Sequence, residues 1–310
     1  MIEYFRSVRG SLTRLEHYEP GCWINVVGPT PDELTRLSQH YDVPMDYLLY
    51  SLDLDERPRF ERDGEYILIV MQTSFAFGDE ADVPFDTLPL GIIHTPAALV
   101  TVSTVTNPVL EEVKAGRIRG LSTVKRNRFT MQVFLRVAQR YLLDLRQINR
   151  QVDAIETRLE TSTQNRELLG LLRYEKSLVY FKTALKANEL MMERIRRDRV
   201  FEMYPDDHDL FEDVLIENLQ AIEMTDIATN ILVSMMGAFA SVISNNVNAV
   251  VKVLTVATIM VAIPTWITGV FGMNVRLPLM DSPWGFAIII TLCLLSAGGL
   301  LLWFRTQKWL

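Results

Sequence analysis

The sequence contains few of the residues from which catalytic and metal centres are built. Its 310 residues include two cysteines, Cys22 and Cys293, and four scattered histidines. It has no glycine-rich phosphate loop, no Ser/His/Asp or Cys/His set, and no Cys and His spacing typical of zinc sites. We therefore expect no enzymatic activity. We also expect no disulfide, because Cys293 lies in a long uncharged stretch and Cys22 does not, and unpaired thiols fit a reducing compartment.

Charge is absent from two long stretches near the C-terminus. Residues 253–271 and 282–304 contain no Asp, Glu, Lys or Arg, and each stretch is long enough to cross a bilayer as a helix. The loop between them is too short for a domain, so the two helices are expected to form a hairpin. Residues 272–274, Gly-Met-Asn, lie at the tip of this hairpin.

No signal or transit peptide is visible at the start, where Glu3 is mixed with Arg6 and Arg9. The first four fifths of the chain are therefore expected to be soluble and cytosolic. The net charge of −7 speaks against nucleic acid as a partner.

Positive charge flanks the two uncharged stretches on one side. Lys252 precedes the first, and Arg305 and Lys308 follow the second, whereas the loop balances Arg276 against Asp281. Because cytoplasmic flanks of membrane helices are enriched in Lys and Arg, we expect both termini in the cytosol and the loop on the opposite side of the membrane.

The soluble part contains two kinds of pattern. Residues 1–125 carry β-branched runs at 22–27, 66–71 and 99–102, with helix-start signals between them, which predicts a mixed α/β domain. In residues 126–205, apolar residues recur at helical spacing on both sides of a polar break, which predicts a helical hairpin.

Two charged runs border this hairpin. Basic residues gather at 117–128 and at 194–199, and an acidic run follows at 202–213. A solvated helix face and a site for an acidic partner both account for the basic clusters. Salt bridges between subunits or a hydrated cation site would account for the acidic run.

After Pro205 no proline occurs before Pro264, so we expect one helix from about residue 209 through the first uncharged stretch, about 90 Å long. An apolar stripe and a second stripe of small or polar residues run along it. The second, the small-residue stripe, consists of Asn230, Ser234, Gly237, Ser241, Ser244, Asn248, Val251, Thr255, Thr258, Ala262, Thr265 and Gly269.

A stripe of this kind is either a close-packing face or the lining of a hydrated pathway. The stripe stays on the same face of the helix before and within the first uncharged stretch. The apolar stripe already offers a face for packing, so the pattern favours a pore. One helix cannot enclose a channel, and several copies must therefore surround an axis.

Three short segments carry a family resemblance. They are Phe-Gly-Met-Asn at 271–274, Lys-Val-Leu-Thr at 252–255, and Lys-Trp-Leu at 308–310. In this placement they resemble the CorA family of divalent-cation channels. The resemblance implies an α+β membrane protein that forms a funnel-shaped homopentamer in the cytoplasmic membrane, among its lipids. Its implied parts are a cytosolic α/β domain (1–125), a helical hairpin (126–205), a stalk and first membrane helix (206–271), an outer loop (272–285), a second membrane helix (286–304) and a basic tail (305–310).

The resemblance also implies roles for individual residues. Gly272, Met273 and Asn274 would form the selectivity filter, in which a ring of Asn274 amide oxygens accepts hydrogen bonds from the water shell of Mg²⁺, an ion that dehydrates reluctantly. Together with the small-residue stripe, it predicts that the pore is lined by Asn248, Val251, Leu254, Thr255, Thr258, Ala262, Thr265 and Gly269.

In the family, Mg²⁺ bound between neighbouring cytosolic domains holds the channel shut. Asp213 resembles the acid that this regulatory site takes from the stalk. On the α/β side Phe77 stands at the nearest position, and Asp79 just beyond it is the acid that we assign.

We therefore expect a passive, gated Mg²⁺ channel, with Mg²⁺ as transported and regulatory ion and Co²⁺ or Ni²⁺ as further divalent cations. A zinc transporter of the same superfamily is the alternative. An alternative of another class is a membrane-tethered cytosolic scaffold or sensor.

Arg276 departs from the family's usual loop sequence. A ring of arginines at the pore entrance would lower the local cation concentration unless Asp281 neutralises it.

Overall fold

A computed structural model describes residues 1–8, 11–116, 118, 120–161, 165–273, 278 and 282–307. Contacts between residues group the chain into two compact units, Met1–Met236 and Gly237–Leu310.

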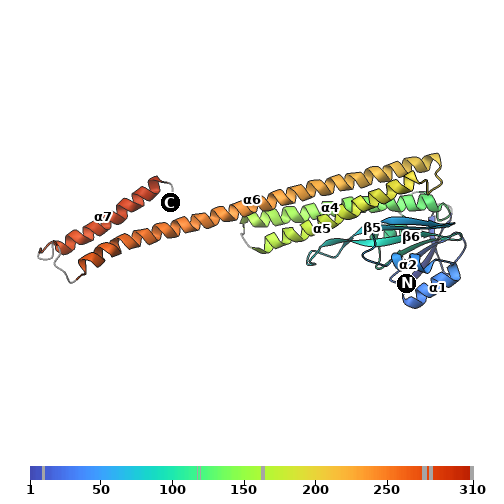
Figure 1. Ribbon diagram of the computed structural model, residues 1–310, viewed down its shortest axis with the longest axis horizontal. Coiled ribbons are helices and arrows are strands. Elements are labelled where there is room, and N and C mark those ends of the chain that lie inside the picture. The colour runs from blue at the N-terminus through green and yellow to red at the C-terminus, as the bar shows by residue number, and fades with distance from the viewer. Residues whose placement is uncertain are drawn as a thin grey trace. The chain divides into compact units, whose positions relative to one another are not determined.

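The first unit contains one seven-stranded sheet (Figure 1). β3 and β7 pair in parallel, and every other neighbouring pair is antiparallel. This mixed sheet confirms the predicted α/β fold, and the three strands expected from β-branched runs are β3, β5 and β7. The strands, in the order β2-β1-β3-β7-β6-β5-β4, are β1 (Ile2–Val8), β2 (Ser11–Leu15), β3 (Trp23–Val27), β4 (Arg59–Asp63), β5 (Tyr66–Ala76), β6 (Phe85–His94) and β7 (Leu99–Ser103).

Three short helices accompany the sheet: α1 (Pro31–Tyr41), α2 (Met45–Tyr50) and α3 (Pro108–Lys114). α1 begins with a capping box, in which the Glu33 N–H donates to Thr30 Oγ1 at 3.3 Å and the Thr30 N–H donates to the Glu33 carboxylate at 2.9 Å. This confirms the helix start that the sequence predicted. The apolar faces of α1 and α2 pack with β3, β5 and β7 in a cluster that includes Leu37, Leu48 and Val70.

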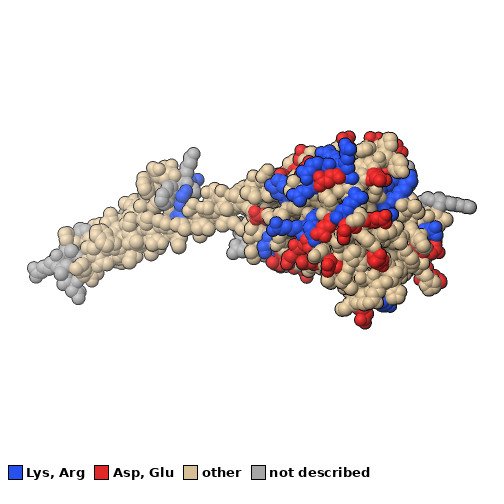
Figure 2. All heavy atoms as spheres, turned by 45° about the vertical axis from the view of Figure 1, so that its right-hand side comes forward, with Lys and Arg blue, Asp and Glu red and all other residues tan. Residues whose placement is uncertain are grey.

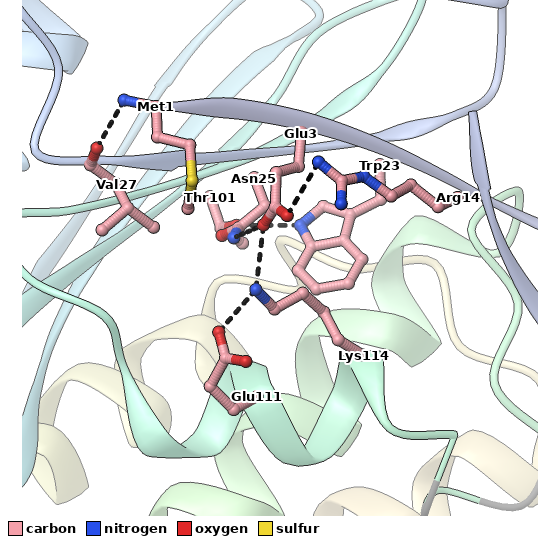
Figure 3. Close-up of polar contacts among 9 residues, drawn as sticks. All are labelled: Met1, Glu3, Arg14, Trp23, Asn25, Val27, Thr101, Glu111 and Lys114. Carbon is pink, nitrogen blue, oxygen red and sulfur yellow. Dashed lines mark hydrogen bonds and ion pairs between the residues drawn. The ribbon is translucent and has the colours of Figure 1, made fainter. Parts of the chain in front are cut away.

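A buried polar cluster fastens the first strand to the sheet and to α3 (Figure 3). The Glu3 carboxylate accepts hydrogen bonds from Lys114 Nζ at 2.9 Å and Asn25 Nδ2 at 3.3 Å, and it lies 3.4 Å from Arg14. Burial alone would raise the pKa of the Glu3 carboxyl, but Lys114, Asn25 and Arg14 outweigh it, and this pKa is lowered. The carboxylate is therefore charged at neutral pH, with a partner on three different elements.

Two long helices, α4 (Arg126–Thr161) and α5 (Asn165–Arg197), contact β5 and β6. Tyr141 and Phe181 meet edge to face with ring centroids 4.9 Å apart, and Phe181 also contacts Phe85 of β6. Residues 67–74 of β5 and 89–94 of β6 are thus buried, which fits the apolar run from Ile67 to Met71.

α6 (Pro205–Phe271) contains 67 residues and begins four residues before the predicted start. A proline is tolerated at the first helical position because its missing N–H would have no partner there. Asn218 of α6 is buried and donates to the Leu185 carbonyl oxygen at 3.2 Å, and Asp226 pairs with Lys182 at 2.6 Å. These contacts hold the first half of α6 against α5.

The second unit pairs the C-terminal half of α6 with α7 (Gly285–Thr306), which runs antiparallel to it (Figure 1). The Cys293 Sγ lies 3.9 Å from the carbonyl oxygen of Pro264. Cys22 and Cys293 are both free thiols, as predicted.

Both helices of this unit are long and apolar enough to cross a membrane, with mean hydropathy of 2.0 for the best window of α6 and 2.4 for that of α7. Only 6% of each window is buried inside the chain, so most of this apolar surface is available to lipid or to other copies. Figure 2 shows charged side chains gathered on the first unit and nearly absent from the second, in which Lys252 and Arg305 are the charged residues that the structure describes.

Candidate ion pathway on the C-terminal helices

The small-residue stripe is exposed along its whole length on α6. Val256 and Ile267, by contrast, are buried. Both lie on the side of the helix that carries Pro264, whose carbonyl oxygen is 3.9 Å from Cys293 Sγ of α7. Thr258 and Gly269 each follow one of these buried residues by two positions, which is about 200° around a helix. The stripe therefore faces away from α7, and α7 does not use it for packing.

The threonines of the stripe share one hydrogen-bond arrangement. The hydroxyls of Thr255 and Thr258 each donate to the carbonyl oxygen four residues earlier at 2.8 Å, and Thr265 does so at 2.7 Å. A hydroxyl whose hydrogen is used in this way still has oxygen lone pairs to offer. Each threonine thus presents an acceptor to whatever lies beside the stripe, as the water shell of a cation requires.

The part of this face next to Lys252 is more apolar. Val251 is 52% exposed and Leu254 is 65% exposed. Asn248, one turn earlier, and Ala262, two turns later, are also exposed. Polar, apolar and then small residues therefore succeed one another along the face.

The hairpin tip follows directly on the last turn of α6. The Gly272 N–H donates to the Thr268 carbonyl oxygen at 2.9 Å, and the Met273 N–H donates to that of Val270 at 3.3 Å. A Cβ at position 272 would lie 3.2 Å from the Thr268 oxygen, which is tighter than ordinary contact. Glycine thus lets the chain close tightly over the helix end. The Met273 side chain is 53% exposed in the single chain.

Asn274, Arg276 and Asp281 lie outside the described residues. Their expected roles, as selectivity filter and as opposing charges in the loop, therefore stay predictions.

The two acids expected in the regulatory site occupy different surroundings. Asp79 accepts hydrogen bonds from Tyr174 Oη at 3.0 Å and from Gln151 Nε2 at 3.3 Å, beside a cavity of about 800 Å³. Burial, and then the hydrogen bond to Asp79, raises the pKa of Tyr174. Asp213 is exposed on α6, and within the part of the chain that is described it contacts no oppositely charged partner. The described contacts do not join the two acids within one chain.

Sequence reasoning missed the partners of Asp79. Gln151 of α4 and Tyr174 of α5 are separated from it by 72 and 95 positions, and contacts at such range leave no local pattern. Among the described residues, no group of three or more His, Cys, Asp and Glu side chains could hold a metal ion.

Comparisons with known proteins bear on the whole chain. Residues 19–306 match the family described as CorA-like Mg²⁺ transporter protein. The cobalt/magnesium transport protein CorA of Methanocaldococcus jannaschii is 28% identical over 299 residues, which cover 93% of this chain and 91% of the relative.

Solved structures show a common fold. The complete structure of the CorA magnesium transporter from Methanocaldococcus jannaschii has a TM-score of 0.86 at 24% identity, and the match covers 100% of this chain and 99% of that one. The cytoplasmic domain of ZntB from Vibrio parahaemolyticus has a TM-score of 0.61 at 15% identity and covers 79% of this chain and 97% of its own.

Proposed function

The chain belongs to the CorA family of Mg²⁺ transporter proteins, and we propose on this premise that it is a passive, gated channel for Mg²⁺ in the cytoplasmic membrane. Co²⁺ is proposed as a further substrate, because the relative from Methanocaldococcus jannaschii is described as a cobalt/magnesium transport protein, and Ni²⁺ as another. We propose no catalytic activity. The observation that carries the proposal is the exposed, hydroxyl-bearing stripe that faces away from α7 and leads to the Gly-Met-Asn tip.

The proposed assembly is a homopentamer with α6 of each copy around a central axis. A single exposed face cannot enclose a pathway, whereas a ring of identical faces does so by symmetry. Within such a ring the small-residue stripes face the axis and α7 of each copy lies outside, against lipid. The exposed apolar surface of α7 supports this arrangement.

Mg²⁺ holds its water shell strongly, so the pathway is proposed to conduct the ion with waters attached. A ring of Asn274 amides at the outer mouth accepts hydrogen bonds from these waters. Thr265, Thr258 and Thr255 then offer further acceptor oxygens along the axis, each with its own hydrogen bonded to the helix backbone. The waters around the ion therefore donate hydrogen bonds to neutral protein oxygens at successive levels of the pore, in place of bulk water.

Val251 and Leu254 are proposed to form the gate. Rings of exposed apolar side chains close a narrow pore by excluding water, and a hydrated divalent ion does not cross a dry section. The driving force is the membrane potential, which contributes about 4.6 kcal/mol for a divalent ion across about 100 mV. No energy-coupling site is required for uptake.

Regulation is proposed to use Mg²⁺ between subunits, with Asp213 of one copy and Asp79 of the next as ligands. The lack of an oppositely charged partner for Asp213 within the described chain supports this role, because an exposed carboxylate is available to an ion. Asp79 is already held by Tyr174 and Gln151, which would orient its carboxylate.

Zinc transport is the second candidate, and the likeness to the ZntB cytoplasmic domain is the observation that raises it. At 15% identity this likeness concerns the fold alone. Magnesium is preferred because the family match and the 28% identical relative both name it.

The deciding experiment measures Mg²⁺ uptake into proteoliposomes with a Mg²⁺-sensitive dye under an inside-negative potential. We expect Asn274→Ala to reduce uptake at least about tenfold, because the outer ring loses its acceptors. Ser282→Ala, a small polar change in the same loop region, is the control and should transport normally. Unchanged uptake in Asn274→Ala would reject the pore assignment and favour a tethered scaffold or sensor.

A further inference from the structure

A cavity of about 690 Å³ in the first unit is lined by arginines from two elements that are far apart in sequence. Arg57 lies two residues before β4, and Arg194 and Arg197 lie in the last turn of α5. We call this the arginine cavity. The sequence showed the cluster on α5 but gave no sign that Arg57 would join it.

The arginines of this cavity differ in what they contact. Arg197 pairs with Asp198 at 3.0 Å, and Arg59, which also lines the cavity, pairs with Glu56 at 2.9 Å. Arg57 and Arg194 are exposed, and no carboxylate of the described chain pairs with either. Two guanidinium groups are therefore available to an external anion.

The surface next to the arginine cavity is also positively charged. Arg194 and Arg197 also line an adjoining cavity of about 440 Å³, to which Arg196 is added and Glu193 contributes one negative charge. Asp198 is the acidic residue that lines the arginine cavity itself, and it is occupied by Arg197.

The cavity lining also includes the apolar side chains of Phe60, Leu190 and Met191. We call these side chains the floor of the cavity and its arginines the rim. Leu190 is 58% exposed, although the first unit buries most of its large apolar side chains. Guanidinium groups bind phosphate oxygens through paired N–H donors, while an apolar floor suits a flat ring system. A cavity with arginines and apolar side chains together favours a ligand that carries both phosphate groups and a flat ring system.

We propose that the arginine cavity binds a nucleoside polyphosphate, with its phosphates on Arg57 and Arg194 and its base over Phe60 and Leu190. The volume lies within the usual range for small-molecule sites, about 300–1,000 Å³. The site is separate from the ion pathway, and its test requires no transport.

The test is isothermal titration of the purified full-length chain in detergent, with EDTA present so that the nucleotide is free of metal. ATP should bind more tightly than tripolyphosphate, which uses only the rim, and more tightly than adenosine, which uses only the floor. The double variant Arg57→Ala/Arg194→Ala should weaken ATP binding at least about tenfold. The matched control Arg62→Ala/Lys186→Ala, which removes two exposed charges from β4 and α5 outside the cavity, should bind ATP as the wild type does.

A second variant tests the floor. Leu190→Ser should weaken the binding of ATP but leave that of tripolyphosphate unchanged, and it does not alter the charge. The proposal is overturned if both double variants lose affinity equally, since binding would then follow overall charge. It is also overturned if a short-chain anionic phospholipid binds the wild type while ATP does not, and loses affinity in Arg57→Ala/Arg194→Ala, since the cavity would then be a lipid site. Loss of the oligomer in Arg57→Ala/Arg194→Ala, without ATP binding to the wild type, would show instead that the cavity is a contact between copies.

Discussion

At the scale of single residues, the membrane unit offers a matched pair of threonines. Thr265 on the small-residue stripe and Thr291 on α7 are both exposed, and each hydroxyl donates to the carbonyl oxygen four residues earlier, at 2.7 Å and 2.8 Å. Replacement by valine keeps the shape and removes the hydroxyl. If the stripe lines the pathway, Thr265→Val removes one acceptor per copy from the ion's water shell.

We expect Thr265→Val to slow Mg²⁺ uptake into proteoliposomes about three- to tenfold, and Thr291→Val to leave it unchanged. The estimate corresponds to the loss of about one hydrogen bond, near 1 kcal/mol. Equal uptake by the two variants would show that the stripe is a packing face and not a lining.

At the scale of the elements, His94 connects the end of β6 to α4 and to the segment after α5. It is 4% exposed, its Nε2 lies 2.8 Å from Thr130 Oγ1, and its ring stacks on Phe201. Burial, reinforced by the positive charge of Arg126, lowers the pKa of His94 to about 3. The folded chain therefore keeps this imidazole neutral while the unfolded chain protonates it below about pH 6.5.

Between about pH 6.5 and pH 3 the unfolded state binds the additional proton, so the free energy of unfolding falls as the pH falls. The His94 contribution is at most about 1.4 kcal/mol per pH unit. We expect His94→Gln to reduce this slope in urea unfolding of the full chain, followed by tryptophan fluorescence from about pH 7 to about pH 5. Exposed His17→Gln is the control and should keep the wild-type slope; a common slope in all three chains would contradict the assignment.

The elements also show which parts of the fold the sequence could specify. α1 was predictable because its Thr30 cap, its proline and Glu33 are local signals, and the membrane helices because absence of charge over a long run is a local property. The sheet order could not be predicted, since the pairing of β3 with β7 joins segments about 75 residues apart. The stripe was visible as a period in the sequence, but the placement of α7 on its opposite side required the structure.

At the scale of the whole molecule, the proposed regulation by intracellular Mg²⁺ would require more than one copy of the chain. Asp213 has no oppositely charged partner in the described chain, and Asp79 accepts hydrogen bonds from Tyr174 and Gln151. A divalent ion between two copies would tie the closed arrangement together, and its release would shift the population toward open states. The coupling expected for such an effector is about 1–3 kcal/mol, or about 5- to 150-fold in affinity.

Asp213→Lys replaces the exposed carboxylate with an ammonium group, which repels the ion. We expect the Mg²⁺ concentration that half-closes the channel, measured by electrophysiology on reconstituted protein, to rise at least about fivefold. Glu223→Lys makes the same charge change at another exposed position of α6 and should gate as the wild type does, so that any difference is not an effect of net charge. If Asp213→Lys closes at the wild-type Mg²⁺ concentration while still conducting, the regulatory site lies elsewhere and the ion pathway stands without it.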